Sequence, residues 1–401
     1  MKKLRVGVWL ENYEAAAGGG FGYYTQLVKK INTYNFKDAD IVFLSNNNEV
    51  DHINFERKYN IKWKPYHETR AIRIINFAAR KLRISTREKL REKRKKENEG
   101  QLKRELNQYV DVIYYLSPTC VFPDFPYIYT IWDLGHLSMY AFPEVNMNNV
   151  FEKRKYHHDH YPHKALMIFA ESNKGKQEII QYLKINEERI KVVPLFPSEI
   201  VNEDVSPKLP ESIDADLFFI HYPAQYWAHK NHFNLLMAFT KIIEKIPSIK
   251  LILTGADKGN KEYIKQLIAE YNLDRYVIDM GFVSNEELKW LYLNSQGLVM
   301  PTFLGPTNMP ILEAAELGCP VACSKLEGHI EQLGDYGYYF DPKDPKEIAS
   351  TICAMIDDKT SNIKRNYKNN FNINRAMVSI DKAFSELKHI RFCWGFNDEI
   401  F

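Results

Sequence analysis

Short apolar runs alternate with amphipathic stretches along this chain of 401 residues, which is the pattern of strands and helices in alternation. Before the middle of the chain, runs typical of buried strands cover residues 4–10, 40–45, 109–116, 127–131, 165–170 and 190–195. Further on, the series restarts with residues 217–220, 250–255, 276–280, 297–300 and 336–341. Residues 196–213, between the two series, lack periodicity and predict a linker. The alternation predicts an α/β protein with doubly wound parallel sheets.

The composition is that of a globular protein, with 45% apolar and 26% charged residues and a formal net charge of +3. This charge is too small to indicate a partner, and no apolar run reaches the roughly 18 residues that a membrane span needs. The start is basic and then apolar, but Glu11 and Asn12 end the run and favour a strand over a signal peptide. The five scattered cysteines have no metal-ligand spacing, so we expect reduced thiols in a cytoplasmic protein.

Residues 297–321 predict a strand, a loop, a short helix and a second strand. Pro310 lies where a first helical turn tolerates proline, and Gly318 and Pro320 end the helix. Backbone N–H groups at such a helix start, with the positive end of the helix dipole, suit a phosphate. Glu313 lies near that start, where its carboxylate can accept hydrogen bonds from ribose hydroxyls. An ordinary βαβ crossover without a ligand is the alternative interpretation.

Two strand ends in the first half carry further candidates. Polar residues beyond the carboxyl end of a strand are where open α/β sheets bind ligands, and Asp133 and His136 lie beyond strand 127–131. A capping aspartate and a packed histidine are the alternative interpretation of this pair. A glycine-rich turn after the first strand lets the backbone approach a phosphate or a sugar closely. Its candidate contacts are Gly19, Gly20 and Gly22.

The stretch 301–321 is similar to the donor-binding motif of retaining glycosyltransferases with the GT-B fold, specifically the large family four. The resemblance implies two Rossmann-like domains that face a central cleft, with a nucleotide-sugar bound by the second domain. Glu313 matches the second of two motif glutamates, which holds the ribose in the family. The first glutamate contacts the donor sugar and should stand at position 305, where this chain has Gly305. We interpret this Gly-Pro-Thr-Asn version of the motif as a variant branch.

The resemblance also implies donor contacts outside that motif. A basic pair clamps the donor diphosphate in the family; Lys230 matches its lysine, and Gln225 stands at the position of its arginine. Residues 281–283 resemble the turn that lines the nucleobase pocket, where Val283 would offer backbone hydrogen bonds. The other expected donor-binding residues are Gly255, Gly305, Thr307, Asn308 and Met309. The expected catalytic residues are Asp133, His136 and Lys230.

From the resemblance we also expect an N-terminal acceptor domain over residues 1–198 and a C-terminal donor domain over residues 214–375. The segment 376–401, with a helix at about 376–390, is expected to pack back onto the first domain. Family members often have His-Asp-Leu where this chain has Trp132-Asp-Leu134. Asp133 or His136 would accordingly meet the acceptor hydroxyl or the donor sugar.

Residues 80–104 hold twelve Lys or Arg and four Glu, a local net charge of +8, within a helix predicted over residues 70–106. A solvated helix or loop is one interpretation, and a dock for an anionic membrane surface is the other. Nucleic acid is not an expected partner, because the segment lacks interleaved aromatic residues and base-reading motifs. No metal or other cofactor is expected, because Pro162 ends the helix that carries the histidine cluster, namely His157, His158, His160 and His163.

The expected function is transfer of a sugar from a nucleotide-sugar to a glycan or lipid-linked glycan, with retained anomeric configuration. The setting would be polysaccharide or glycan biosynthesis, with the protein peripheral at the cytoplasmic face of the membrane. The GT-A fold is not expected, since its Asp-x-Asp metal motif follows a strand, whereas residues 38–40 and 214–216 precede theirs. A nucleotide-sugar epimerase of the same fold and a non-catalytic nucleotide-sugar binding protein are the alternatives. Gly305 and Gln225 are the departures that favour the binding protein.

Overall fold

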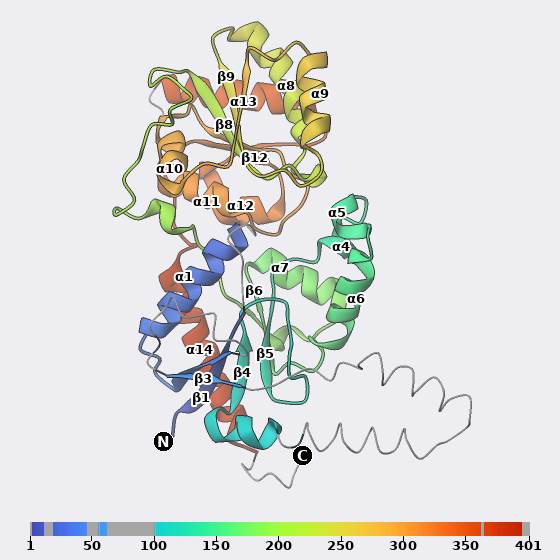
Figure 1. Cartoon of the computed structure of the whole chain (residues 1–401), viewed down its shortest axis with the longest axis vertical. Coiled ribbons are helices and arrows are strands. Elements are labelled where there is room, and N and C mark those ends of the chain that lie inside the picture. Colours follow the sequence, from blue (N-terminus) through green and yellow to red (C-terminus); the bar gives the residue numbers. More distant parts are fainter. Residues whose placement is uncertain are drawn as a thin grey trace, which may run out of the picture.

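The computed structural model describes residues 2–11, 19–45, 55, 57–61, 100, 102–361 and 365–394. Two parallel sheets with helices packed around them lie one above the other in Figure 1, which confirms the predicted doubly wound architecture. In each sheet the second and third strands lie on one side of the first strand, and the later strands follow one another on its other side. In such sheets ligands bind beyond the carboxyl ends of the strands, at the point where the strand order reverses.

The first sheet consists of β3 (Lys58–Asn60), β2 (Ala39–Ser45), β1 (Leu4–Leu10), β4 (Val112–Tyr115), β5 (Tyr127–Ile131), β6 (Met167–Ala170) and β7 (Ile190–Val192), in that order and all parallel. The central strands are buried on both faces, which explains why they are continuous apolar runs in the sequence. The predicted bounds of β1 and β5 are reproduced, whereas β6 begins later and β7 ends earlier than predicted.

The described helices of the first domain include α1 (Gly19–Thr33), α4 (Gly135–Ser138), α5 (Pro143–Asn146), α6 (Val150–His160) and α7 (Asn173–Glu178). Residues 102–109 are helical as well. A π-helical turn, Ile179–Leu183, continues α7. The N-cap of α7 is Ser172, whose hydroxyl oxygen accepts a hydrogen bond from the N–H of Gly175 at 3.0 Å. This cap starts the helix directly after β6, so Glu171 lies at the junction between strand and helix.

The second sheet consists of β10 (Val277–Gly281), β9 (Lys250–Thr254), β8 (Phe219–Pro223), β11 (Leu298–Met300), β12 (Val321–Ser324) and β13 (Tyr338–Phe340), again all parallel. Its helices are α8 (His232–Lys245), α9 (Lys261–Glu270), α10 (Asn285–Asn294), α11 (Met309–Glu316), α12 (Glu327–Leu333) and α13 (Pro345–Thr360). A capping box formed by Ser284 and Glu287 starts α10.

The last described helix, α14 (Ile373–Arg391), returns to the first domain and lies alongside α1 in Figure 1. Its apolar face, including Met377, Ile380 and Phe384, is buried in the same core as β1 and α1. Lys388 adds a hydrogen bond of 2.6 Å to Asp38 at the start of β2. The predicted linker, residues 196–213, is irregular apart from a 3₁₀ turn, Glu199–Val201. Most of the basic segment 80–104 lies outside the described residues.

Candidate functional site

A cavity of about 500 Å³ lies between the two domains. Its walls include the loops that follow β5 and β6 of the first sheet and those that follow β8 and β11 of the second, together with residues of α1, α5, α6 and α11. All four loops leave the carboxyl ends of their strands, where doubly wound sheets bind ligands. The polar lining residues of the first domain are Asp133, Glu144, Arg154 and Glu171, and those of the second are Gln225, His229, Lys230, Thr307 and Asn308.

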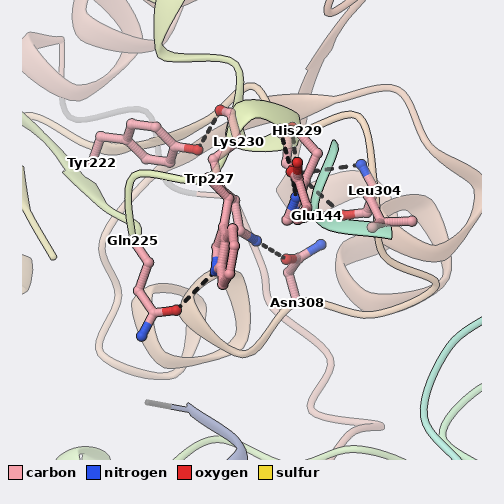
Figure 2. Close-up of polar contacts among 9 residues, drawn as sticks. Glu144, Tyr222, Gln225, Trp227, His229, Lys230, Leu304 and Asn308 are labelled. Carbon is pink, nitrogen blue, oxygen red and sulfur yellow. Dashed lines mark hydrogen bonds and ion pairs between the residues drawn. The ribbon is translucent and has the colours of Figure 1, made fainter. Parts of the chain in front are cut away.

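Lys230 ends a 3₁₀ turn, Ala228–Lys230, that follows β8 (Figure 2). Its ammonium donates a hydrogen bond of 3.1 Å to the side-chain oxygen of Asn308, directly before α11. Burial lowers the pKa of Lys230 to about 8, and the nearby carboxyl of Glu144 acts in the opposite direction. A lysine that has lost part of its hydration beside a helix start is a suitable partner for a phosphate.

The loop before α11 adopts a backbone that requires glycine at position 305. Gly305 has a φ of +127°, and an added Cβ would lie 2.7 Å from the amide nitrogen of Asn308 and 2.9 Å from the oxygen of Thr307. A glutamate at this position would therefore strain the loop in its present conformation. Pro310 stands in the first turn of α11 as predicted. The N–H of Asn308 is not free, because it donates to Gln332 at 2.9 Å.

Gln225, the uncharged residue at the expected arginine position, lines the cavity but is held in place by a neighbour. Its side-chain oxygen accepts a hydrogen bond of 3.0 Å from the indole N–H of Trp227 (Figure 2). His229, two residues after Trp227, contacts the first domain. Glu144 accepts hydrogen bonds from the backbone N–H of His229, at 2.8 Å, and from its ring. Burial opposes ionisation of Glu144, but these hydrogen bonds outweigh it and lower its pKa.

Asp133 lines the cavity, as expected, and forms an ion pair with Arg154 of α6. It also accepts a hydrogen bond of 2.7 Å from the N–H of Gly135. Burial opposes ionisation, but the Arg154 guanidinium outweighs it and lowers the pKa of Asp133. Asp133 is therefore ionised and held by a guanidinium that also lines the cavity, an arrangement that the sequence analysis did not foresee.

His136 does not face the cavity, contrary to the sequence-based expectation. It is fully buried, and its ring packs 5.0 Å from that of His158 and 6.0 Å from that of Phe151. Burial lowers its pKa to about 3. The turn of α4 directs Asp133 into the cavity and His136 into the core, so the histidine is a packing residue.

Glu313 lies on α11, 5% exposed and beyond the residues that line the cavity. Its carboxylate accepts hydrogen bonds from the hydroxyl of Ser198, in the linker, and from that of Tyr292 at 2.7 Å. Burial raises its pKa, and both hydroxyls act in the opposite direction. Glu313 is thus oriented from two sides, one of which is the connection between the domains.

Of the remaining residues that the sequence predicted to bind the donor, some line the cavity and others do not. Gly20, Thr307, Asn308 and Met309 line the cavity, whereas Gly19, Gly22 and Val283 do not. Val283 packs instead with Leu291 and other apolar residues of the second domain. Gly255 permits a close approach of two loops, since an added Cβ would lie 2.2 Å from the backbone oxygen of Ala224.

Glu171 lines the cavity, although the sequence analysis did not single it out. It is 9% exposed, and its carboxyl accepts a hydrogen bond of 2.6 Å from the hydroxyl of Thr307, in the other domain. Burial raises its pKa to about 8, although the Thr307 hydroxyl acts in the opposite direction. Its position beyond the carboxyl end of β6 was the available signal.

Within the described ranges, no three His, Cys, Asp or Glu side chains are placed to hold a metal ion, including the histidine cluster of α6. The helices in this part of the chain include none that is long and apolar enough to cross a membrane.

Solved structures with this arrangement identify the fold as GT-B. A glycosyltransferase from Rickettsia africae ESF-5 aligns with a TM-score of 0.68 and 16% identity, over 96% of this chain and 99% of its own. Anabaena HepE in complex with UDP and glucose aligns with a TM-score of 0.58 and 16% identity, over 97% of this chain and 95% of its own.

The second domain also resembles a sequence family. Residues 208–372 match the family described as "Glycosyl transferases group 1". O-antigen chain mannosyltransferase B of Escherichia coli is 28% identical over 199 residues, which are 48% of this chain and 52% of that protein. D-inositol 3-phosphate glycosyltransferase of Pseudarthrobacter chlorophenolicus is 22% identical over 213 residues, 50% of this chain and 49% of that protein. The chain thus matches about half the length of these relatives.

Proposed function

We propose that this protein transfers a sugar from a nucleotide-sugar donor to a hydroxyl of a glycan or lipid-linked glycan, with retained anomeric configuration. The observation that carries the proposal is the cavity between the two domains, where Lys230 and the start of α11 face carboxyl groups of the first domain. A cation and a helix start suit a diphosphate, and carboxyl groups suit sugar hydroxyls. The name of the E. coli relative supports a role in cell-surface polysaccharide biosynthesis.

In this proposal the donor lies along the second domain. The diphosphate contacts Lys230 and the loop before α11, the ribose reaches toward Glu313, and the base lies near the backbone of Val283. The carboxylate of Glu313 has acceptor sites beyond those used by Ser198 and Tyr292, because two carboxylate oxygens offer about four lone-pair sites. The sugar then points toward Asp133 and Glu171 in the first domain.

Retention fits a front-face reaction, in which the acceptor oxygen approaches the anomeric carbon on the side from which the diphosphate leaves. The bond from the anomeric carbon to the diphosphate oxygen breaks, the bond to the acceptor oxygen forms, and the acceptor proton passes to the leaving diphosphate. Lys230 would stabilise the negative charge that develops on that diphosphate, without the need to reorganise at the moment of reaction.

The proposal is tested by incubating the protein with UDP-, GDP-, dTDP- and CDP-sugars and measuring release of nucleoside diphosphate, with and without oligosaccharide acceptors. Acceptor-dependent release together with an extended glycan supports transfer. A changed sugar in the nucleotide-sugar, without acceptor, would instead identify an epimerase. Donor binding without either product would identify a binding protein.

Asp133→Asn is expected to lower turnover by roughly 10- to 100-fold, as for the loss of a charge-assisted hydrogen bond to the ligand. The binding of nucleoside diphosphate, measured by calorimetry, should stay close to that of the wild type, because Asp133 faces the sugar side of the cavity. Asp159→Asn is the matched control, since Asp159 also pairs with a basic residue of α6 but does not line the cavity. Full turnover in the Asp133 variant would contradict this assignment.

The basic segment 80–104 is proposed to position the enzyme at an anionic membrane face, because its local net charge of +8 exceeds the +3 of the whole chain. Each basic residue near such a surface contributes about 1 kcal/mol, screened by salt. Co-sedimentation with vesicles rich in phosphatidylserine should therefore be strong at low salt and weak at high salt. The triple variant Arg91→Glu, Arg94→Glu, Lys95→Glu should lose it. Binding that ignores salt or survives in this variant would show that the segment is a solvated region.

A further inference from the structure

Among the described residues, three carboxyl groups line the cavity between the domains, and their surroundings differ. Asp133 is paired with the guanidinium of Arg154, and Glu144 is engaged by His229. Glu171, by contrast, has only a neutral partner among the described residues, the hydroxyl of Thr307 at 2.6 Å. The second oxygen of its carboxyl receives no hydrogen bond from the part of the chain that the structure describes. Because Glu171 lines the cavity, this open oxygen is available to a ligand there.

A buried carboxyl without a cationic partner lowers the stability of the folded protein. Glu171 is 9% exposed, and removing a carboxyl from water without a cation destabilises its charged form. Packing alone does not require a carboxyl at this position, since an apolar side chain of similar size would avoid the cost. Buried ionisable groups in clefts are, for this reason, candidates for a functional role.

The position of Glu171 relative to the second domain indicates which chemical group of a bound ligand it can contact. Thr307, its partner, precedes Asn308, and Asn308 holds the ammonium of Lys230 at 3.1 Å. Glu171 therefore lies at the loop that presents the diphosphate site, but it faces this loop from the first domain. Next to the diphosphate, the group of a nucleotide-sugar that can exchange hydrogen bonds with this carboxyl is a hydroxyl of the attached sugar.

The loop itself has no acidic side chain at its turn, because Gly305 has no room for a Cβ. A carboxyl that meets a ligand beside this turn must therefore come from the opposite wall, where Glu171 is placed by the capped start of α7. We propose that Glu171 binds a hydroxyl of the transferred sugar and so helps to determine which sugar the protein accepts. That the ligand is a sugar rests on the proposed function. The choice of Glu171 rests on the geometry of the cavity.

The chemistry of the carboxyl agrees with this role. Because burial raises the pKa of Glu171 to about 8, the group is largely protonated at neutral pH in the ligand-free protein. A protonated carboxyl donates one hydrogen bond and accepts others, as a sugar hydroxyl does. Glutamine keeps both abilities, whereas methionine keeps the approximate shape and removes them.

The test compares UDP with UDP-glucose and GDP with GDP-mannose by calorimetry, using the full chain and no acceptor. The quantity of interest is the factor by which the sugar changes affinity relative to the parent diphosphate. Glu171→Met should weaken binding of the sugar nucleotide by about tenfold or more, as for one lost hydrogen bond, and leave the diphosphate unchanged. Glu171→Gln should retain most of the wild-type affinity. Glu178→Gln is the matched control, because Glu178 is also 9% exposed, lies on α7 and does not line the cavity.

Each other outcome overturns the assignment. Equal losses for the diphosphate and its sugar conjugate in Glu171→Met would mean that Glu171 only supports the loop at Thr307. Unchanged affinity for both ligands would mean that the sugar does not contact this residue. A wild-type protein that binds neither pair is tested in the same way with dTDP and dTDP-glucose and with CDP and CDP-glucose. Failure to bind any of the four pairs would reject the proposed function itself, and the assignment with it. Thermal unfolding of every variant identifies a folding defect, and the glutamine variant provides the comparison if the methionine variant does not fold.

Discussion

Replacement of Lys230 by alanine is expected to lower sugar transfer by about 100- to 1,000-fold, the usual effect of removing one preorganised group that stabilises developing charge. Lys230 is half-buried and lines the cavity, and its ammonium donates a hydrogen bond to Asn308, directly before α11. The binding of nucleoside diphosphate should weaken much more than the binding of the nucleoside alone, because only the diphosphate would contact the ammonium. Steady-state kinetics and calorimetry with both ligands measure the two effects.

Lys325→Ala is the control for Lys230→Ala, because Lys325 is an exposed lysine of the same domain that does not line the cavity. The pH dependence provides a second check. Above the pKa of Lys230, about 8, the ligand-free protein carries a neutral amine that must take up a proton when the diphosphate binds. The affinity for diphosphate should thus fall with rising pH above that value, by up to about tenfold per unit. Lys230→Met should lack this fall, and equal losses for nucleoside and diphosphate in Lys230→Ala would contradict the proposed contact.

Glu313→Ala is expected to weaken the binding of every nucleoside diphosphate that the wild type binds, by roughly 10- to 100-fold. This loss corresponds to about 1.5–3 kcal/mol for a charge-assisted hydrogen bond to the ribose. The same change should lower stability, because it leaves the buried hydroxyl of Tyr292 and that of Ser198 without their acceptor. An unsatisfied buried polar group costs about 1–3 kcal/mol. Calorimetry and thermal unfolding of the same samples measure both consequences.

Tyr292→Phe separates the two effects of Glu313→Ala. It removes one hydrogen bond from Glu313 and leaves the carboxylate in place, so it should lower stability while nucleotide binding remains. If Glu313→Ala keeps full nucleotide affinity with the fold intact, Glu313 has a structural role only, as the acceptor that joins α11 to α10 and the linker.

The predicted effects of changing Lys230 depend on its position and its pKa, and the sequence alone indicates only the position. Lys230 could be identified from its motif, but the lowering of its pKa results from burial against residues of both domains. The same holds for Gln225: the sequence shows the missing charge, and only the structure shows that Trp227 holds its side chain.

The sequence by itself determined the features that depend on neighbouring residues. The bounds of β1 and β5 and the proline in the first turn of α11 were all predicted. Each results from side chains within a few positions of one another, whose periodicity and capping preferences act before any distant contact forms. The same local information indicated parallel sheets, since most of the apolar strands are followed by a helix.

Only the tertiary structure decided which side chains meet in the cavity. Asp133 and His136 are close in sequence, yet one lines the cavity and the other is buried against His158. The contact between Glu171 and Thr307 joins residues 136 positions apart, and no periodicity or spacing encodes it. It exists because two separately folded sheets place their carboxyl-terminal loops against each other, so its geometry depends on the relative position of the domains.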